Sequence, residues 1–259
     1  MHLLRLIRRL VLVSGFTLLC YVFLLLTSPG VFHSDPARWR ARVLRGWARG
    51  TAWLLGMRIE VRGAPPGAPF FLVTNHLGYV DVLVLASQTP CAFIAKAEIA
   101  RWPVFGALCR SVNTVFIQRQ SKRDIPSVVE QIDGVLRREV GVVLFPEATS
   151  SMGAEVLPFR PSLLESAARA RLPVSYAALT YRTSPDAPPA HLSVCWWGDM
   201  TFGRHLLSLL GVRRIDARVT FGPDRILEDD RKVLAEHLRR AVEACFDPVV
   251  RSAPSSPRA

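Results

Sequence analysis

The chain has 259 residues, of which 50% are apolar and 21% are charged, and its formal net charge is +12. This composition excludes a disordered chain, and five cysteines without a C-x-x-C spacing exclude a disulfide scaffold and zinc or redox motifs of that type. The length suits one domain with a sizeable core and a short additional segment. Residues 1–50 hold eight arginines and a single acidic residue, Asp35, which favours a lipid surface over nucleic acid as the partner.

The first predicted element is an uncharged apolar run from Leu10 to Thr27. Eighteen such residues are enough to cross a bilayer as a helix. A signal peptide is the alternative, because Arg5, Arg8 and Arg9 precede the run as in an n-region. The run is long for such a peptide, however, and no small-x-small cleavage site follows it, so we expect a membrane anchor at residues 10–27.

The second predicted element is a basic amphipathic helix over residues 36–55. At 100° per residue one side carries Trp39, Val43, Trp47, Gly50 and Leu54, and the opposite side carries Arg38, Arg42, Arg45 and Arg49. This pattern predicts a helix in the lipid headgroup layer, and a helix packed on the domain is the alternative. Residues 1–55 are therefore expected to form the membrane anchor. Positive charge flanks the apolar run on both sides, so a true span and a re-entrant helix pair both stay open.

Beyond residue 56, short β runs alternate with helical stretches. We expect strands at Met57–Val61, Phe70–Thr74, Cys91–Lys96, Thr114–Gln118, Val142–Phe145, Val174–Thr180, Leu192–Trp197 and Ala217–Phe221. Helices are expected to begin at Asp124 and at Glu228. The alternation predicts an α/β domain over residues 56–247, with a mixed, mostly parallel sheet flanked by helices. Residues 248–259 are predicted to be a disordered tail, and neither repeats nor a second domain are evident.

One candidate site follows the predicted strand that ends at Thr74. The segment Asn75-His76-Leu77-Gly78-Tyr79-Val80-Asp81 leads into an apolar helical run. His76 is therefore expected at the carboxyl end of a strand, where α/β sheets bind ligands, and Asp81 in the first turn of the next helix. An aspartate there can bond one imidazole nitrogen and leave the other free as a general base. The alternative is a structural histidine that caps the helix.

Two further strand ends carry chemically useful side chains. Phe145-Pro146-Glu147-Ala148-Thr149-Ser150 follows one predicted strand, and Arg119 follows another. Each side chain alone is typical of a protein surface. Because three strand ends deliver His76, Arg119 and Glu147 to one edge of the sheet, we expect a site.

The N-H-x4-D motif, the strand-terminal Arg119 and F-P-E-x-T, in this order, resemble the glycerolipid acyltransferase family, which includes the lysophosphatidic acid acyltransferases. The resemblance covers roughly residues 57–221. It implies that His76 takes a proton from the acceptor hydroxyl, that Asp81 orients it, and that the hydroxyl attacks the thioester of acyl-CoA or acyl carrier protein. It also implies acceptor binding by the residues of the matching motifs, Asn75, Arg119, Glu147, Ala148, Thr149, Ser150 and Arg160.

The sequence departs from the family pattern at residues that bear on the acceptor. Lysophosphatidate enzymes usually carry F-P-E-G-T-R, whereas this chain has Ala148 and Ser150, and the later F-K-x-G appears with Arg160 in place of the lysine. Losing an arginine removes a bidentate phosphate donor. This form resembles lyso-ornithine lipid acyltransferases, so the acceptor is expected to be lysophosphatidate or a related lysolipid.

These features predict a membrane-associated O-acyltransferase of lipid biosynthesis. A thioester is already activated, so we expect neither a metal nor another cofactor, and the partners are the lysolipid, the acyl thioester and the bilayer. The catalytic domain is expected on the cytosolic face, which is the inner membrane in a bacterium. A lipid-surface hydrolase that uses His76 and Asp81 on water is one alternative, although no G-x-S-x-G motif occurs. A non-enzymatic membrane adaptor is the other.

Overall fold

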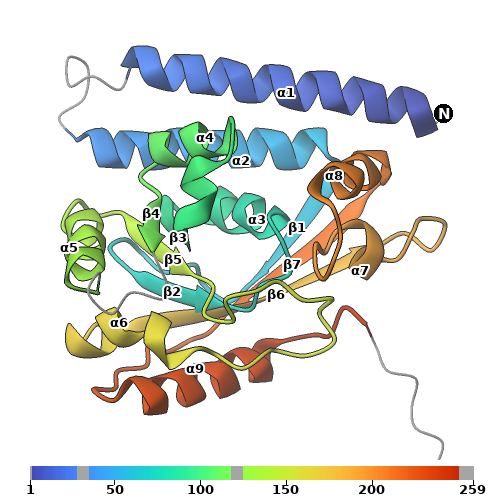
Figure 1. Cartoon of the computed structure of the whole chain (residues 1–259). Coiled ribbons are helices and arrows are strands. Elements are labelled where there is room, and N and C mark those ends of the chain that lie inside the picture. The colour runs from blue at the N-terminus through green and yellow to red at the C-terminus, as the bar shows by residue number, and fades with distance from the viewer. Residues whose placement is uncertain (1, 28–34, 118–124, 251–259) are drawn as a thin grey trace, which may run out of the picture.

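A single mixed sheet organises the chain (Figure 1). The structure, a computed structural model, describes residues 2–27, 35–117 and 125–250. Over these residues the sheet has seven strands in the order β1-β7-β6-β2-β5-β3-β4, and all neighbours are parallel except β6 and β7. The strands are β1 (Met57–Arg62), β2 (Phe71–Thr74), β3 (Cys91–Lys96), β4 (Val115–Ile117), β5 (Gly141–Leu144), β6 (Val174–Thr183) and β7 (Ile215–Phe221). The predicted mixed, mostly parallel α/β fold is confirmed.

Helices cover both faces of this sheet, which explains why the central strands are apolar throughout. Side chains of β2 alternate between the two cores: Leu72 joins one, and Phe71 and Val73 join the other. The helices on the Leu72 side are α2 (Pro36–Leu54), α3 (Val80–Gln88), α7 (Ala190–Ser193) and α8 (Phe202–Gly211). Those on the other side are α5 (Ile125–Leu136), α6 (Glu165–Arg169) and α9 (Arg231–Cys245).

The first helix, α1 (His2–Thr27), lies along α2 on the outer side of this helical layer (Figure 1). It also contacts α8 and α4 (Phe105–Ser111), which follows the short 3-10 helix η1 (Ala97–Arg101). Near the start of α1, Arg9 is buried and donates hydrogen bonds to backbone carbonyls at the end of α8, including that of Arg213 at 3.1 Å. Arg5 donates to the carbonyl of Gly211. Helix carbonyls at a C-terminus lack intrahelical partners, so the two arginines tie α1 to the domain.

α2 packs on the domain, which is the alternative given for the basic amphipathic helix, and its place in the headgroup layer stays a prediction. Arg45 and Arg49 donate to the carbonyl of Ser87 at the end of α3, where cations are favourable. On the other side, the indole N–H groups of Trp39 and Trp47 donate to Thr27 and Thr17 of α1, respectively. Because α2 lies between α1 and the sheet, both of its sides are used in packing.

Two other predictions need correction. Residues 192–197 do not form a strand: α7 ends at Ser193, and the following segment passes over the turn after β2, where the Trp196 N–H donates to the Leu77 carbonyl at 2.8 Å. Residues 248–250, assigned to a disordered tail, are packed, because the Val249 N–H donates to the Gly153 carbonyl at 2.7 Å. An apolar run such as L-S-V-C-W-W matches the pattern of a buried strand. The buried side chains of this run are covered, however, because the segment crosses the core and not because it pairs in the sheet.

Candidate active site

The N-H-x4-D motif occupies the turn between β2, which ends at Thr74, and α3, which begins at Val80. β2 is a central strand, so the turn lies at the carboxyl end of the sheet, as predicted. Gly78 has φ +153°, and a Cβ atom there would lie 2.9 Å from the backbone nitrogen of Trp196. Only glycine allows the segment around Trp196 to approach the turn this closely.

Asn75 is placed beside the catalytic turn but is committed to the backbone. Its side-chain nitrogen donates to the Leu179 carbonyl at 3.0 Å, and its side-chain oxygen accepts from the Leu179 N–H at 2.7 Å. Asn75 is also buried. It therefore extends the β2–β6 pairing by one step and fixes the start of the turn, whereas the sequence assigns it to substrate binding.

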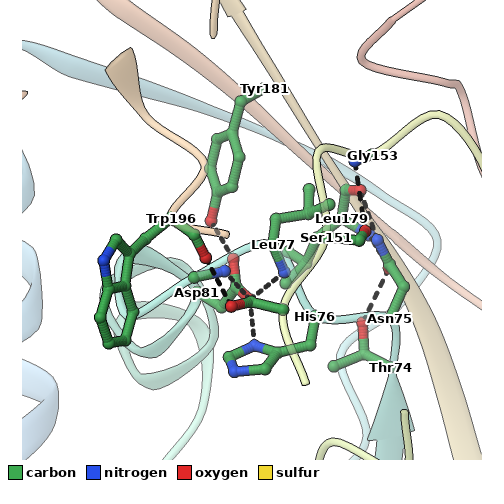
Figure 2. Close-up of polar contacts among 12 residues, drawn as sticks. Thr74, Asn75, His76, Leu77, Asp81, Ser151, Gly153, Leu179, Tyr181 and Trp196 are labelled. Carbon is green, nitrogen blue, oxygen red and sulfur yellow. Dashed lines mark hydrogen bonds and ion pairs between the residues drawn. The ribbon is translucent and has the colours of Figure 1, made fainter. Parts of the chain in front are cut away.

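His76 and Asp81 form a hydrogen-bonded pair, as Figure 2 shows. Nδ1 of His76 lies 2.7 Å from Oδ2 of Asp81, and the His76 ring stacks on Phe145 with centroids 4.2 Å apart. The aspartate side chain is fully buried, whereas the histidine side chain is 24% exposed. The bond to Asp81 fixes the tautomer, so Nε2 is the nitrogen available to accept a proton.

The Asp81 carboxylate accepts three further hydrogen bonds (Figure 2). The N–H groups of Leu77 and Gly78 donate to Oδ2 at 2.8 and 3.1 Å, and the Tyr181 hydroxyl donates to Oδ1 at 2.7 Å. Sequence reasoning missed Tyr181, because one tyrosine in an apolar strand carries no motif and its contact depends on how β6 passes the turn. Trp196 was missed for the same reason, since the segment that contains it was assigned to a strand.

Glu147 lies in the turn after β5, with 2% of its surface exposed. Among the described residues neither carboxylate oxygen has a hydrogen bond of good geometry, although the backbone at His76 and Leu157 lies close enough to favour the charged form. Burial outweighs this help and raises the pKa of Glu147 to about 9, and the charge of Asp81 acts in the same direction. Glu147 is therefore a neutral acid near pH 7, able to donate a hydrogen bond.

The neighbours of Glu147 fall into different settings. Ala148 is buried with φ +65°, a conformation that favours glycine, so the backbone shape expected for F-P-E-G-T persists despite the side chain. Thr149 is exposed. The Ser150 hydroxyl donates to the Trp196 carbonyl, which joins the two segments that flank the catalytic turn.

The two predicted arginines have different outcomes. Arg160 is exposed, and its backbone N–H donates to the Pro146 carbonyl at 2.9 Å, so it lies next to the turn that carries Glu147. Arg119 lies outside the described residues. The structure thus brings His76, Asp81 and Glu147 together at the carboxyl edge of the sheet, with Arg160 nearby. The arrangement supplies a general base with an oriented imidazole and a neutral acid a short distance away.

Comparisons with known proteins agree with this chemistry. A family model described as acyltransferase matches residues 58–180. The chain is 34% identical to lyso-ornithine lipid O-acyltransferase of Rhizobium meliloti (strain 1021), over 72% of this chain and 67% of the relative. It is 31% identical to 1-acyl-sn-glycerol-3-phosphate acyltransferase of Neisseria meningitidis serogroup B, over 79% and 81%, respectively.

A solved structure shares the fold. The crystal structure of the 1-acyl-sn-glycerophosphate (LPA) acyltransferase from Thermotoga maritima aligns with a TM-score of 0.63 at 21% identity, over 93% of this chain and 97% of that one. With the His76–Asp81 pair in place and relatives matched over most of their length, the chain belongs to the acyltransferase family.

Proposed function

We propose that the protein transfers a fatty acyl chain from a thioester to the hydroxyl of a lysolipid. Nε2 of His76 takes the hydroxyl proton while the oxygen attacks the thioester carbonyl. The new C–O ester bond forms as the C–S bond breaks, and the proton leaves with the thiol. The pairing of His76 with buried Asp81 at 2.7 Å carries this proposal, because an alcohol needs a positioned base at neutral pH.

The donor is acyl-CoA or acyl carrier protein, and the transfer requires no metal or other cofactor, because the thioester is already activated. The developing oxyanion still needs donors. The N–H groups of Leu77 and Gly78 cannot serve, since both bond Asp81. We assign Glu147 to the glycerol or head-group oxygens of the acceptor, to which its neutral acid donates once the bound lipid displaces the groups that bury it, while Arg119 and Arg160 hold acidic groups.

We also infer that α1 lies in one leaflet as part of a re-entrant anchor rather than crossing the bilayer. The segment Leu3–Thr27 is long and apolar enough to span, with a mean hydropathy of 2.4. The start of α1, however, bonds to the domain through Arg9, which donates to a carbonyl at the end of α8, and its last residue, Thr27, bonds to Trp39 of α2. These contacts hold α1 along the domain, which favours a helix that enters one leaflet and returns through α2. The domain then faces the cytosol, on the inner membrane in a bacterium.

The acceptor is lysophosphatidate or a lysolipid with a less anionic head group, such as lyso-ornithine lipid. Two observations support the second choice. Ser150 replaces the arginine of F-P-E-G-T-R and uses its hydroxyl on the Trp196 carbonyl, so it offers no charge to a phosphate. Relatives named for lyso-ornithine lipid also match the chain over most of their length, as in Pseudomonas aeruginosa, with 31% identity over 91% of that protein.

The test is acyl-CoA consumption and lipid mass spectrometry with a panel of lysolipid acceptors in mixed micelles. We expect lysolipid-dependent transfer by the full chain, and a loss of roughly 10²–10⁴-fold in kcat for His76→Ala. His237→Ala is the matched control, because that histidine lies on α9 and pairs with Glu228. A folded His76→Ala protein with near wild-type transfer contradicts the proposal, as does acyl-CoA hydrolysis that is independent of lysolipid.

A further inference from the structure

Tyr181 reaches the catalytic aspartate from a strand that is remote in sequence. β6 pairs with β2 in register, with Ala177 opposite Thr74, and continues past the end of β2. The Asn75–Leu179 pair of hydrogen bonds holds this continuation against the catalytic turn. Two residues later, Tyr181 is fully buried and places its hydroxyl 2.7 Å from Oδ1 of Asp81 (Figure 2).

The two oxygens of the Asp81 carboxylate have different partners. Oδ2 bonds to Nδ1 of His76 and accepts hydrogen bonds from the backbone N–H groups of Leu77 and Gly78, and all three residues belong to the same turn. Oδ1 receives the Tyr181 hydroxyl, the one hydrogen bond to this carboxylate from outside the turn among the described residues. Rotation of a carboxylate about its last side-chain bond is soft, so the donors at both oxygens decide its plane.

Resting on the proposed function, we propose that Tyr181 is a positioning residue that locks the Asp81 carboxylate and thereby orients the His76 imidazole for proton transfer. Tyr181 acts only through Asp81 and does not touch the substrate. Its hydroxyl also shares the aspartate charge, which limits how strongly the carboxylate attracts a protonated His76.

Other titratable groups face Asp81 and must be considered for any pH dependence. Among the described residues these are His76, Tyr181, Glu147 and Cys195. Burial, with the Asp81 charge, raises the pKa of both Tyr181 and Cys195 above their usual values, and the pKa of Glu147 is about 9. All three stay protonated near pH 7.

The test compares Tyr181→Phe with Tyr176→Phe, which removes the same atom from the same strand without touching Asp81. For Tyr181→Phe we expect kcat to fall roughly 10- to 100-fold, within the contribution of a general base, with the acceptor KM within about twofold. The acid limb of the kcat/KM profile moves to higher pH, because the unshared aspartate charge holds the His76 proton more strongly. If Tyr181 had only a structural role, Tyr181→Phe would lower the folded fraction of the protein and leave the pH profile of kcat/KM unchanged.

A mutant cycle with Asp81→Ala keeps the inference falsifiable if Tyr181→Phe folds poorly, because the double variant lacks the Asp81 carboxylate that the tyrosine hydroxyl would otherwise leave without a donor. Once Asp81 is absent, Tyr181→Phe should change the residual kcat by less than about twofold. The inference is overturned if Tyr181→Phe has the kcat and pH profile of the wild type. It is also overturned if Tyr181→Phe lowers kcat by the same factor whether Asp81 is present or replaced by alanine. Full activity of His76→Ala instead overturns the proposed function, so the two failures are distinguishable.

Discussion

Glu147 is a buried acid, and the folded protein disfavours its ionised form. Replacing Glu147 with glutamine should therefore stabilise the protein, by an amount that grows as the pH rises. The folded-state pKa is about 9 against an ordinary value of 4.5. The unfolded chain therefore releases this proton first, and stability is lost progressively as pH rises from 4.5 to about 9. Below pH 4.5 both states hold the proton and Glu147 carries no such penalty.

The magnitude follows from the width of this window. One pKa unit corresponds to about 1.36 kcal/mol, so the penalty is about 3 kcal/mol at pH 7 and below about 1 kcal/mol at pH 5. Glu147→Gln keeps the shape and removes the ionisable group. At about 2–4 °C per kcal/mol for a domain of this size, its Tm should exceed that of the wild type by roughly 6–12 °C at pH 7.

The assay is thermal unfolding in detergent at several pH values between 5 and 9, with Glu155→Gln as the control, because Glu155 is exposed. The control should show no pH-dependent gain. If the gain of Glu147→Gln is the same at every pH, or is negative at pH 7, the reasoning is refuted.

Three further predictions concern substrate choice, membrane attachment and the docking of α1. Ser150→Arg should shift the ratio of kcat/KM values toward lysophosphatidate over lyso-ornithine lipid by about ten- to a hundred-fold, which is the effect of one charge-assisted contact. Competition between the two acceptors measures this ratio. An unchanged ratio contradicts the interpretation of Ser150. The intact protein should stay on membranes in high salt, because burial of the exposed apolar side of α1 is not screened, whereas complete extraction by salt alone contradicts the anchor. Arg9→Ala should leave attachment intact but weaken the docking of α1, seen as faster proteolysis after α1.

Local patterns in the sequence were sufficient to predict much of the fold and the pairing of His76 with Asp81. Unbroken apolar runs such as Val142–Leu144 are typical of strands covered on both faces, and the structure places them at the centre of the sheet. His76 and Asp81 are close in sequence and meet across one turn, so spacing predicts their contact. The fold class and the His76–Asp81 contact are therefore local properties of the chain.

The tertiary structure alone decided which contacts remote segments make. The burial of Glu147 and the resulting rise of its pKa come from several elements closing over one carboxyl group, which no local pattern reports. Tyr181 contacts Asp81 because β6 extends several residues beyond the end of β2. This extension of β6 depends on its pairing with β7. Arg45 and Arg49 of α2 bond to carbonyls at the end of α3, a contact that the sequence did not predict, because an amphipathic pattern gives the direction of a side but not its neighbour. Spacing along a chain determines which side chains share a turn or a face, whereas packing determines what those faces meet.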